Sequence, residues 1–308
     1  MKIFSALPAT GWQKSESGRI LKYKTVFVHL MVPVAFFVPY RTELLVWGLV
    51  CYFSYVFFWE CGSHRYFSHR SFKTSRVFQF LLALGAAISG MRGPLWWASH
   101  HRLHHRYSDT PQDPHSPLHR GFWYSHMGWL FEGHTVDTDL DSVKDFSSYP
   151  ELVWLNRYHN EVMILWATLI ILLGQFTTAF GQVGLGLSAF VWLFCIPLAL
   201  NLQAAFVINS LTHGTKPNLF FHRRFETKDS TTNSWLLSIP TMGCSWHNNH
   251  HRFMKAARAG FVWWQVDPTY MILRVLKIFG VVWELTAVPV QIIKEGWPAT
   301  GTDSRPQA

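Results

Sequence analysis

Histidines at metal-ligand spacing are the residues of this chain best suited to chemistry. His101, His104 and His105 stand at i, i+3 and i+4, so on a helix they project from one face. The same H-x-x-H-H pattern returns later in His247, His250 and His251. A looser pair, His64 and His69, precedes both patterns. Imidazole suits Fe, Zn, Cu or Ni rather than Mg or Ca. The pattern therefore predicts a transition-metal site.

A ninth imidazole follows the last apolar run. Asn209 and His213 lie four residues apart there, which makes His213 a further candidate ligand and Asn209 an amide that could hold a metal-bound water. Since one metal takes roughly four to six ligands, this number of imidazoles predicts two metals. Structural zinc sites are usually cysteine-rich and closed, so two irons that activate O₂ fit better. His100, four residues before His104, is an alternative to His101.

The composition points to a membrane rather than to water or nucleic acid. Aromatic residues make up 17% of the chain, with 16 tryptophans, while charged residues make up only 15%, against about a quarter in soluble domains. The net charge of +9 comes without a dense Lys/Arg block, so no nucleic-acid partner is expected. The four cysteines are scattered and form neither a disulfide framework nor a zinc motif.

Four apolar runs set the expected architecture. The first two are slightly shorter than the roughly 20 residues that span a bilayer, but a helical hairpin extended by its flanks can still cross. We expect an all-α membrane protein with four transmembrane helices in two hairpins, interfacial helices and a cytosolic histidine-rich helical cap, all in one domain over residues 1–308. The expected spans are 25–40, 44–61, 162–180 and 185–211; the cap is 62–160 and 212–295, and a disordered tail follows at 296–308.

Three further segments have patterns of their own. Val77–Met91 is apolar but too short for a span, which favours an interfacial or buried helix. The prolines of residues 108–120 predict a loop. Residues 268–282 repeat apolar side chains with a helical period, which predicts an amphipathic helix on a surface.

The basic residues orient this arrangement. Four crossings place the N-terminus, the middle region and the tail on one side, and of the 27 lysines and arginines only Arg41 falls in a predicted outer turn. Such a bias marks the cytosolic side of a membrane. All the histidine clusters fall on that side, so we expect an integral membrane protein with a cytosolic active site.

The order of the histidine motifs matches a known pattern. Around the four apolar runs, the chain carries in order H-x-x-x-x-H, H-x-x-H-H, N-x-x-x-H and H-x-x-H-H. This order resembles that of the integral-membrane fatty acyl desaturases, specifically the acyl-CoA Δ9 (stearoyl-CoA-type) branch. The resemblance covers about residues 25 to 285 and extends to three further segments: Asp113–Pro117, Gly121–Trp129 and Trp246–His251.

That resemblance implies a di-iron centre bound by nine histidines: His64, His69, His101, His104, His105, His213, His247, His250 and His251. It also implies that Asn209 holds a metal-bound water and that Trp97 lines a bent tunnel for the acyl chain. The implied reaction consumes O₂ and two electrons and leaves a cis double bond, expected at Δ9, in a saturated chain carried on CoA. A separate ferredoxin or cytochrome-type donor with an NAD(P)H reductase is expected, because the chain has no nucleotide fingerprint, iron–sulfur cysteine set or haem domain.

Two segments depart from the family pattern. Where the animal enzymes carry a basic pair, Gly128–Leu130 runs into Phe131 and Glu132, which leaves an acyl-lipid or a carrier-protein ester open as the substrate. The lead-in Trp59–Ser63 is more polar than the usual glycine-rich one, and its Glu60 is expected to pair with a nearby arginine. The compact length and acidic middle region resemble bacterial members, which favours a bacterial inner membrane.

Two other functions could use the same histidines. A fatty acyl hydroxylase would share the site and release an alcohol in place of an alkene. A histidine-rich carrier of zinc or nickel would place its ligands at the middle of the membrane in broken helices, whereas these clusters are expected at or beyond the cytosolic ends of the spans. A desaturase is therefore the preferred interpretation.

Overall fold

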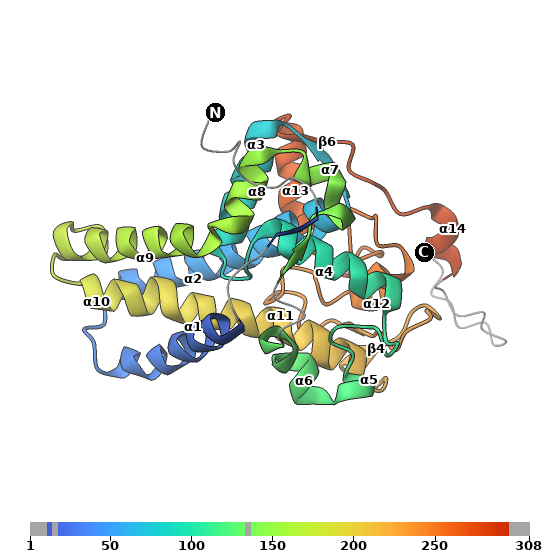
Figure 1. Cartoon of the computed structure of the whole chain (residues 1–308), viewed down its shortest axis with the longest axis horizontal. Coiled ribbons are helices and arrows are strands. Elements are labelled where there is room, and N and C mark those ends of the chain that lie inside the picture. Colours follow the sequence, from blue (N-terminus) through green and yellow to red (C-terminus); the bar gives the residue numbers. More distant parts are fainter. Residues whose placement is uncertain (1–10, 14–17, 133–136, 296–308) are drawn as a thin grey trace.

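Three long apolar helices dominate the computed structural model, which describes residues 11–13, 18–132 and 137–295 (Figure 1). They cover Thr42–Ser68, His159–Phe176 and Gly186–Gly214, each long enough to cross the apolar core of a bilayer. The first is α2 (Thr42–Phe57) continued by the π-helical η3 (Phe58–Ser68), the second is α9 (His159–Phe176), and the third joins α10 (Gly186–Ala189), the π-helical η7 (Phe190–Cys195) and α11 (Ile196–Gly214). The tail predicted as disordered, 296–308, lies outside the described residues.

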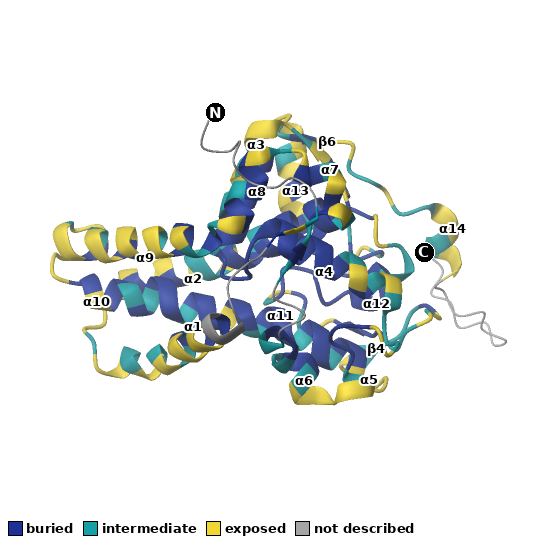
Figure 2. Cartoon of the chain, in the orientation of Figure 1, coloured by how far each residue is buried: buried dark blue, intermediate teal, exposed yellow. Residues whose placement is uncertain are grey.

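The outer faces of these helices are apolar and exposed (Figure 2). Leu165 is 69% exposed and Phe176 is 72% exposed, both on α9, and Leu49 on α2 is 51% exposed. Water-soluble proteins rarely leave so wide an apolar surface uncovered, whereas a bilayer solvates it, with every backbone group paired inside the helix. The chain is therefore a multi-pass membrane protein, as predicted.

The first predicted span, residues 25–40, differs from the other three. Its helix α1 covers Gly18–Met31, and a short 3₁₀ turn, η2, follows at Pro33–Phe36. Pro33 has no N–H to continue the hydrogen-bond ladder of α1, so the helix ends before it. The described part of the chain thus holds a helix and a turn here rather than a fourth long apolar helix, and the fourth crossing stays a prediction.

The second predicted span is longer than expected. Predicted over 44–61, its helix continues to Ser68, so His64 belongs to the long helix and not to the cap. The extension is π-helical, a geometry that is frequent at functional sites. The spans predicted at 162–180 and 185–211 match α9 and the helix that ends at Gly214 closely.

The two turns predicted outside the membrane lie together, at the end away from the histidines (left in Figure 1). Across them, Arg41 donates a hydrogen bond to Gln182. Gly181, at φ +99°, packs against the carboxyl group of Glu43, where a Cβ would come within 3.1 Å. Glycine is favoured there because other residues rarely adopt this backbone conformation.

Short helices and strands build the opposite end of the molecule. The helices are α3 (Arg76–Ile88), α4 (Pro94–Tyr107), α5 (Pro117–Arg120), α6 (Phe122–His126), η4 (Gly128–Phe131), η6 (Asp141–Val143), α7 (Lys144–Ser147), α8 (Pro150–Arg157), α12 (His247–Arg252), α13 (Pro268–Ile278) and α14 (Val290–Glu295). Two-residue antiparallel strands pair β1 (Trp12–Gln13) with β3 (Thr138–Asp139), β2 (Lys73–Thr74) with β6 (Val282–Trp283), and β4 (Phe221–His222) with β5 (Asn233–Ser234). These strand pairs thus join segments that are distant in sequence around the histidines.

The local predictions for this end hold with two corrections, one at the end of the amphipathic helix predicted over 268–282 and one in the loop predicted over 108–120. The short helix predicted over Val77–Met91 is α3, and the predicted amphipathic helix is α13. α13 ends at Ile278 because Gly280 follows at φ +69°, the left-handed conformation that ends helices. The loop predicted over 108–120 is wrong for its last turn, where Pro117 opens α5, since proline suits the first helical position.

An aromatic core lies beneath the histidines. Trp59, Trp96, Trp97 and Trp129 are buried in one apolar cluster contributed by η3, α4, η4 and α11. Trp96 stacks on Trp129 with 5.9 Å between ring centroids, and Trp97 meets Trp59 edge to face at 5.6 Å. This packing fixes the histidine-bearing faces of η3 and α4 relative to each other.

Candidate metal centre

Segments far apart in the sequence bring nine histidines together. η3 and the residue after it supply His64 and His69, α4 supplies His101, His104 and His105, α11 supplies His213, and α12 supplies His247, His250 and His251. Their nitrogens form two groups, the five-histidine cluster of His64, His69, His101, His105 and His250, and the four-histidine cluster of His104, His213, His247 and His251. Within each cluster the candidate ligand atoms lie within 4.8 Å of one another. Every histidine that the sequence singled out as a ligand lies in one of the two.

Both H-x-x-H-H helices serve both clusters. α4 gives His101 and His105 to the five-histidine cluster and His104 to the four-histidine cluster, whereas α12 gives one residue, His250, to the first and two, His247 and His251, to the second. Side chains at i and i+4 share a face of a helix, so each pair of that spacing enters one cluster and the remaining histidine enters the other. The two helices therefore lie between the clusters.

The facing ring nitrogens are spaced as ligands of a common metal. His64 Nε2 lies 3.0 Å from His250 Nε2, and His213 Nε2 lies 3.0 Å from His247 Nε2. Two nitrogens bound at about 2.1 Å to one metal, at right angles, are about 3.0 Å apart. The spacing therefore fits a shared cation in each cluster.

The nitrogen of His104 that faces the four-histidine cluster supports the same conclusion. His104 Nδ1 is occupied by Asp113, and the buried Nε2 has no hydrogen-bond partner among the described residues. A buried nitrogen without a partner costs free energy unless something satisfies it. A metal ion would do so, and the residues present fit one.

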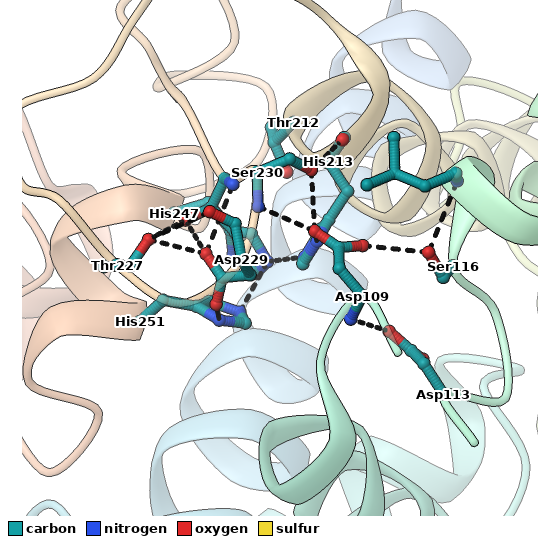
Figure 3. A network of polar contacts seen from close by, with 12 residues as sticks. Asp109, Asp113, Ser116, Thr212, His213, Thr227, Asp229, Ser230, His247 and His251 are labelled. Carbon is teal, nitrogen blue, oxygen red and sulfur yellow. Dashed lines mark hydrogen bonds and ion pairs between the residues drawn. The ribbon is translucent and has the colours of Figure 1, made fainter. Parts of the chain in front are cut away.

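Three aspartates hold the four-histidine cluster from outside, as Figure 3 shows for two of them. The bonds run from His104 Nδ1 to Asp113 at 3.0 Å, from His213 Nδ1 to Asp109 at 3.2 Å, and from His251 Nδ1 to Asp229 at 2.6 Å. Each bond keeps the ring proton on Nδ1 and leaves the Nε2 lone pair free for a metal. The sequence did not predict these contacts, although Asp109 and Asp113 follow the first H-x-x-H-H closely.

These aspartates stay ionised although they are largely buried. Burial raises the pKa of each carboxyl group, but the imidazole contacts outweigh it and hold the pKa values of Asp109, Asp113 and Asp229 well below their usual range. Ser230 adds two bonds to Asp109, from its N at 2.8 Å and its Oγ at 2.6 Å. Negative charge thus surrounds the four-histidine cluster, which favours a bound cation.

Burial keeps four rings of the five-histidine cluster neutral. Burial, and after it the neighbouring imidazoles, lower the pKa values of His69, His101, His105 and His250 well below their ordinary range. Neutral imidazole is the form that binds a metal, so these rings are ready to do so without losing a proton.

Glu60 contacts the five-histidine cluster from the polar lead-in. Its Oε1 accepts from Arg65 Nε at 2.8 Å, which confirms the expected arginine partner. Its Oε2 accepts from His64 Nδ1 at 2.7 Å, a contact that the sequence did not predict.

Asn209 and Trp97 line a small cavity beside the clusters. Its other walls are His100, His101, His115 and Trp129. The Trp97 ring lies nearly parallel to the His101 ring, with 6.1 Å between centroids and 16° between planes. This position fits the predicted parts of Asn209 as a water-holding amide and of Trp97 as a tunnel wall, which stay predictions.

Two other histidines lie near the clusters. His100 does not replace His101, because its Nδ1 lies 3.0 Å from the Trp96 carbonyl oxygen and its ring packs at a tilt against Trp96, with 4.6 Å between centroids. His115 stacks on His104 with 4.3 Å between centroids, a neighbour that spacing alone did not single out. The sequence feature that could have identified His115 as a neighbour of the site is its position two residues after Asp113.

Long membrane helices that end in two adjoining imidazole clusters define a membrane protein with a nitrogen-rich two-metal site. Comparison with known proteins makes the class specific: residues 42–276 match the family model described as fatty acid desaturase. The chain belongs to the fatty acid desaturase family and is a membrane oxidoreductase. Its histidine clusters are consistent with the two-metal site typical of that family, which implies a fatty acyl substrate and O₂.

Curated relatives cover most of the chain. It is 34% identical over 220 residues to the sn-1 stearoyl-lipid 9-desaturase of Anabaena variabilis, covering 71% of this chain and 75% of the relative. It is 35% identical over 271 residues to the Delta-9 acyl-lipid desaturase 1 of Arabidopsis thaliana, covering 84% and 80%. The acyl-CoA 5-desaturase AL21 of Anemone leveillei is 31% identical over 234 residues, covering 75% and 67%.

Proposed function

We propose that this chain is a di-iron, O₂-dependent desaturase that introduces a cis double bond, at the Δ9 position, into a saturated acyl chain of a membrane lipid. The observation that carries the proposal is the pair of imidazole clusters, of five and four histidines, in a chain with long apolar helices. The names of the Anabaena and Arabidopsis relatives support the Δ9 position and the lipid-bound substrate.

Iron is the metal that suits both the ligands and the reaction class. Imidazole binds zinc, copper, nickel and iron, but zinc has no redox chemistry and so cannot serve an oxidoreductase of this kind. When bound, two irons would supply the O₂ chemistry that removes hydrogens from two neighbouring methylenes. The nine histidines of the two clusters would hold them.

The protein's own groups prepare the site. Asp109, Asp113 and Asp229 hold protons on Nδ1 of their histidine partners, so that each Nε2 lone pair faces inward. Asn209 orients a water beside the cluster, and Trp97 closes the cavity on its apolar side. Holding one C–C bond of the substrate there, away from bulk water, is how the chain contributes to selectivity.

A lipid carrier replaces the CoA carrier that the resemblance first suggested. Two of the three relatives described above are named for lipid substrates. The chain also carries Phe131 and Glu132 where the animal acyl-CoA enzymes have a basic pair, and a carboxylate there would repel the phosphates of CoA. An acyl group esterified to a membrane lipid needs no such pair.

A groove on the membrane side supports the lipid carrier. It encloses about 510 Å³ between α2 and α13 and is lined by apolar residues that include Phe53, Phe57, Met242 and Ile272. Met242 is buried in the same aromatic cluster as Trp97, which stacks on His101. The groove therefore offers an apolar surface to an acyl chain from the bilayer, and its Met242 joins the apolar cluster that packs beneath the metal centre.

Electron supply and location complete the proposal. The electrons come from a separate ferredoxin or cytochrome-type donor with its NAD(P)H reductase, since the chain carries no motif for a redox cofactor of its own. The distribution of basic residues supports a centre on the cytosolic side, and the compact length and acidic middle region favour a bacterial inner membrane.

The test supplies the same deuterated saturated acyl chain in two forms. Membranes from a bacterial host that expresses the chain receive it as phosphatidylcholine or as acyl-CoA, with an added electron donor and with acyl transfer blocked. Gas chromatography with mass spectrometry then maps the double bond. We expect a Δ9 cis-monoene from the lipid form only, and none in membranes that carry His250→Ala.

The alternatives give different products. Monoene from acyl-CoA alone would overturn the lipid carrier. A hydroxylated chain would identify a hydroxylase, and a bond at another carbon would overturn the Δ9 assignment. A purified protein that holds zinc rather than two irons, with His104→Ala without effect on product, would overturn the desaturase itself.

A further inference from the structure

We propose that Glu60 is a positioning residue of the five-histidine cluster, which fixes the His64 ring so that its Nε2 faces the other imidazoles. The inference rests on the proposed metal-binding function and extends it to a residue outside the histidine motifs. Glu60 lies in the polar lead-in where this chain departs from the glycine-rich pattern.

The contact is direct and closed to water. His64 Nδ1 donates to Glu60 Oε2 at 2.7 Å, and the two side chains are 3% and 0% exposed. A ring that donates from Nδ1 carries its proton there, so His64 Nε2 keeps its lone pair. That Nε2 lies 3.0 Å from His250 Nε2, inside the cluster. Glu60 therefore sets both the tautomer and the direction of the ring.

The second oxygen of Glu60 is held by an anchored arginine. Arg65 Nε donates to Glu60 Oε1 at 2.8 Å, while its two terminal nitrogens donate to Asp267 at 3.0 and 2.9 Å. Asp267 in turn caps α13 by accepting from the Tyr270 N–H at 3.0 Å. The carboxylate of Glu60 thus has one oxygen fixed to the protein frame and the other turned toward His64.

The π-helical turn explains how one carboxylate reaches both partners. Glu60, His64 and Arg65 all lie in η3, at i, i+4 and i+5. In an α-helix the neighbours on the next turn are at i+3 and i+4, whereas the wider π turn, bonded i to i+5, brings i+4 and i+5 over residue i. The unusual helix geometry and the Glu60 contact are therefore parts of one arrangement.

Neutralising Arg65 does not by itself account for Glu60. Asp267 already pairs with Arg65 through both oxygens, and a second buried carboxylate costs free energy unless its own lone pairs are satisfied. Glu60 Oε2 accepts from His64 Nδ1, and the buried Cys244 thiol lies beside both groups, with its Sγ 3.8 Å from His64 Nδ1. Carboxylates that hold a metal-bound histidine in this way typically change metal affinity by about 10- to 100-fold when removed.

The test compares Glu60→Gln with a matched control. Gln keeps the shape of the side chain but loses the charge. Glu151→Gln makes the same change at a carboxylate that pairs with Arg76 at 2.7 and 2.8 Å and touches no histidine. Full-length protein in detergent is loaded with ferrous iron and exposed to a chelator, and the iron that remains is measured over time together with the thermal unfolding midpoint.

We expect Glu60→Gln to release one of its two irons about 10- to 100-fold faster than wild type, with the second iron unchanged. Glu151→Gln should release both at the wild-type rate. If Glu60→Gln does not fold, Glu60→Asp keeps the charge beside Arg65 but shortens the reach to His64, and it should show the same selective release.

Wild-type release of both irons by the Glu60 variants would overturn the proposal. So would equal loss of both irons with a collapsed unfolding midpoint, because a role in folding alone predicts that outcome. Neither result resembles failure of the proposed function, in which the wild-type protein itself would bind no iron and yield no monoene.

Discussion

The five-histidine and four-histidine clusters share helices α4 and α12 but differ in what holds their imidazoles. Three of the four rings in the smaller cluster donate to aspartates: His104, His213 and His251. Among the described residues, only His64 in the larger cluster has a carboxylate contact, from Glu60. The smaller cluster is thus bordered by charge and the larger one by other rings.

This difference indicates two unequal metal sites. Four nitrogens leave positions open for water or O₂, and the surrounding aspartates hold the cation by charge. Five nitrogens fill most positions around a metal and hold it by their number. We therefore expect the four-histidine cluster to be the more open site, and its metal to depend on the aspartates.

The largest expected effect comes from deleting one ligand in each cluster. His250→Ala and His213→Ala should each lower monoene formation at least about 1,000-fold, because residues that act as a unit fail together. Each variant should also bind about one iron fewer, measured by elemental analysis of the purified membrane protein. Full activity with one histidine missing would contradict a shared centre.

Removing the aspartates should separate the clusters. Asp113→Asn and Asp229→Asn should weaken metal binding at the four-histidine cluster by about 10- to 100-fold and leave the other metal in place. Asp145→Asn is the matched control, since Asp145 pairs with Arg102 at 2.9 Å rather than with a histidine. The release of iron to a chelator, followed over time, shows whether one metal or both leave quickly. Simultaneous loss of both metals would show that the clusters are not independent.

Acid should destabilise the metal-free protein through the five-histidine cluster. The folded-state pKa of His105 is lowered, first by burial and then by its neighbours, so below the ordinary value of 6.5 the unfolded chain binds the extra proton. Stability is therefore lost as pH falls below 6.5, by an amount on the order of 1 kcal/mol per such ring at pH 5.5. His105→Gln should recover that amount in chemical denaturation at pH 5.5 relative to pH 7.5.

His104, in the four-histidine cluster, should give the opposite pH dependence of stability. Burial lowers its pKa, but Asp113 outweighs burial and the net pKa is raised, so His104 stabilises the folded state at low pH and loses that effect as pH rises. His104→Gln should therefore deepen the loss at pH 5.5. The same response from both variants would mean that Asp113 does not raise the pKa of His104 in the folded protein.

The smallest expected effect is at the cavity that the clusters share with Trp97. Trp97→Phe keeps an aromatic ring but removes part of the surface that stacks on His101. We expect monoene formation to fall about three- to tenfold through poorer positioning of the acyl chain, with both irons retained. Loss of iron in this variant would assign Trp97 to the metal site rather than to the tunnel.

The sequence predicted the ligands better than their surroundings. Six of the nine histidines were identified from i, i+3 and i+4 spacing, which a helix converts directly into one face, and the other three from the looser pair His64 and His69 and from His213 after Asn209. Their division between clusters was not predicted, because α4 and α12 each send side chains both ways. Asp229 and Glu60 were not predicted as histidine partners, since nothing in linear spacing connects Asp229 with His251 or indicates a π-helical turn at Glu60.

Sequence by itself determined that this chain carries long apolar helices and imidazoles for two metals, because hydropathy and helical spacing act over a few turns of one segment. Tertiary structure alone decided which imidazoles meet and which carboxylates stand behind them. The pairs His64 with His250 and His213 with Asp109 join residues 186 and 104 positions apart, and only packing of the helices brings such groups within hydrogen-bond distance.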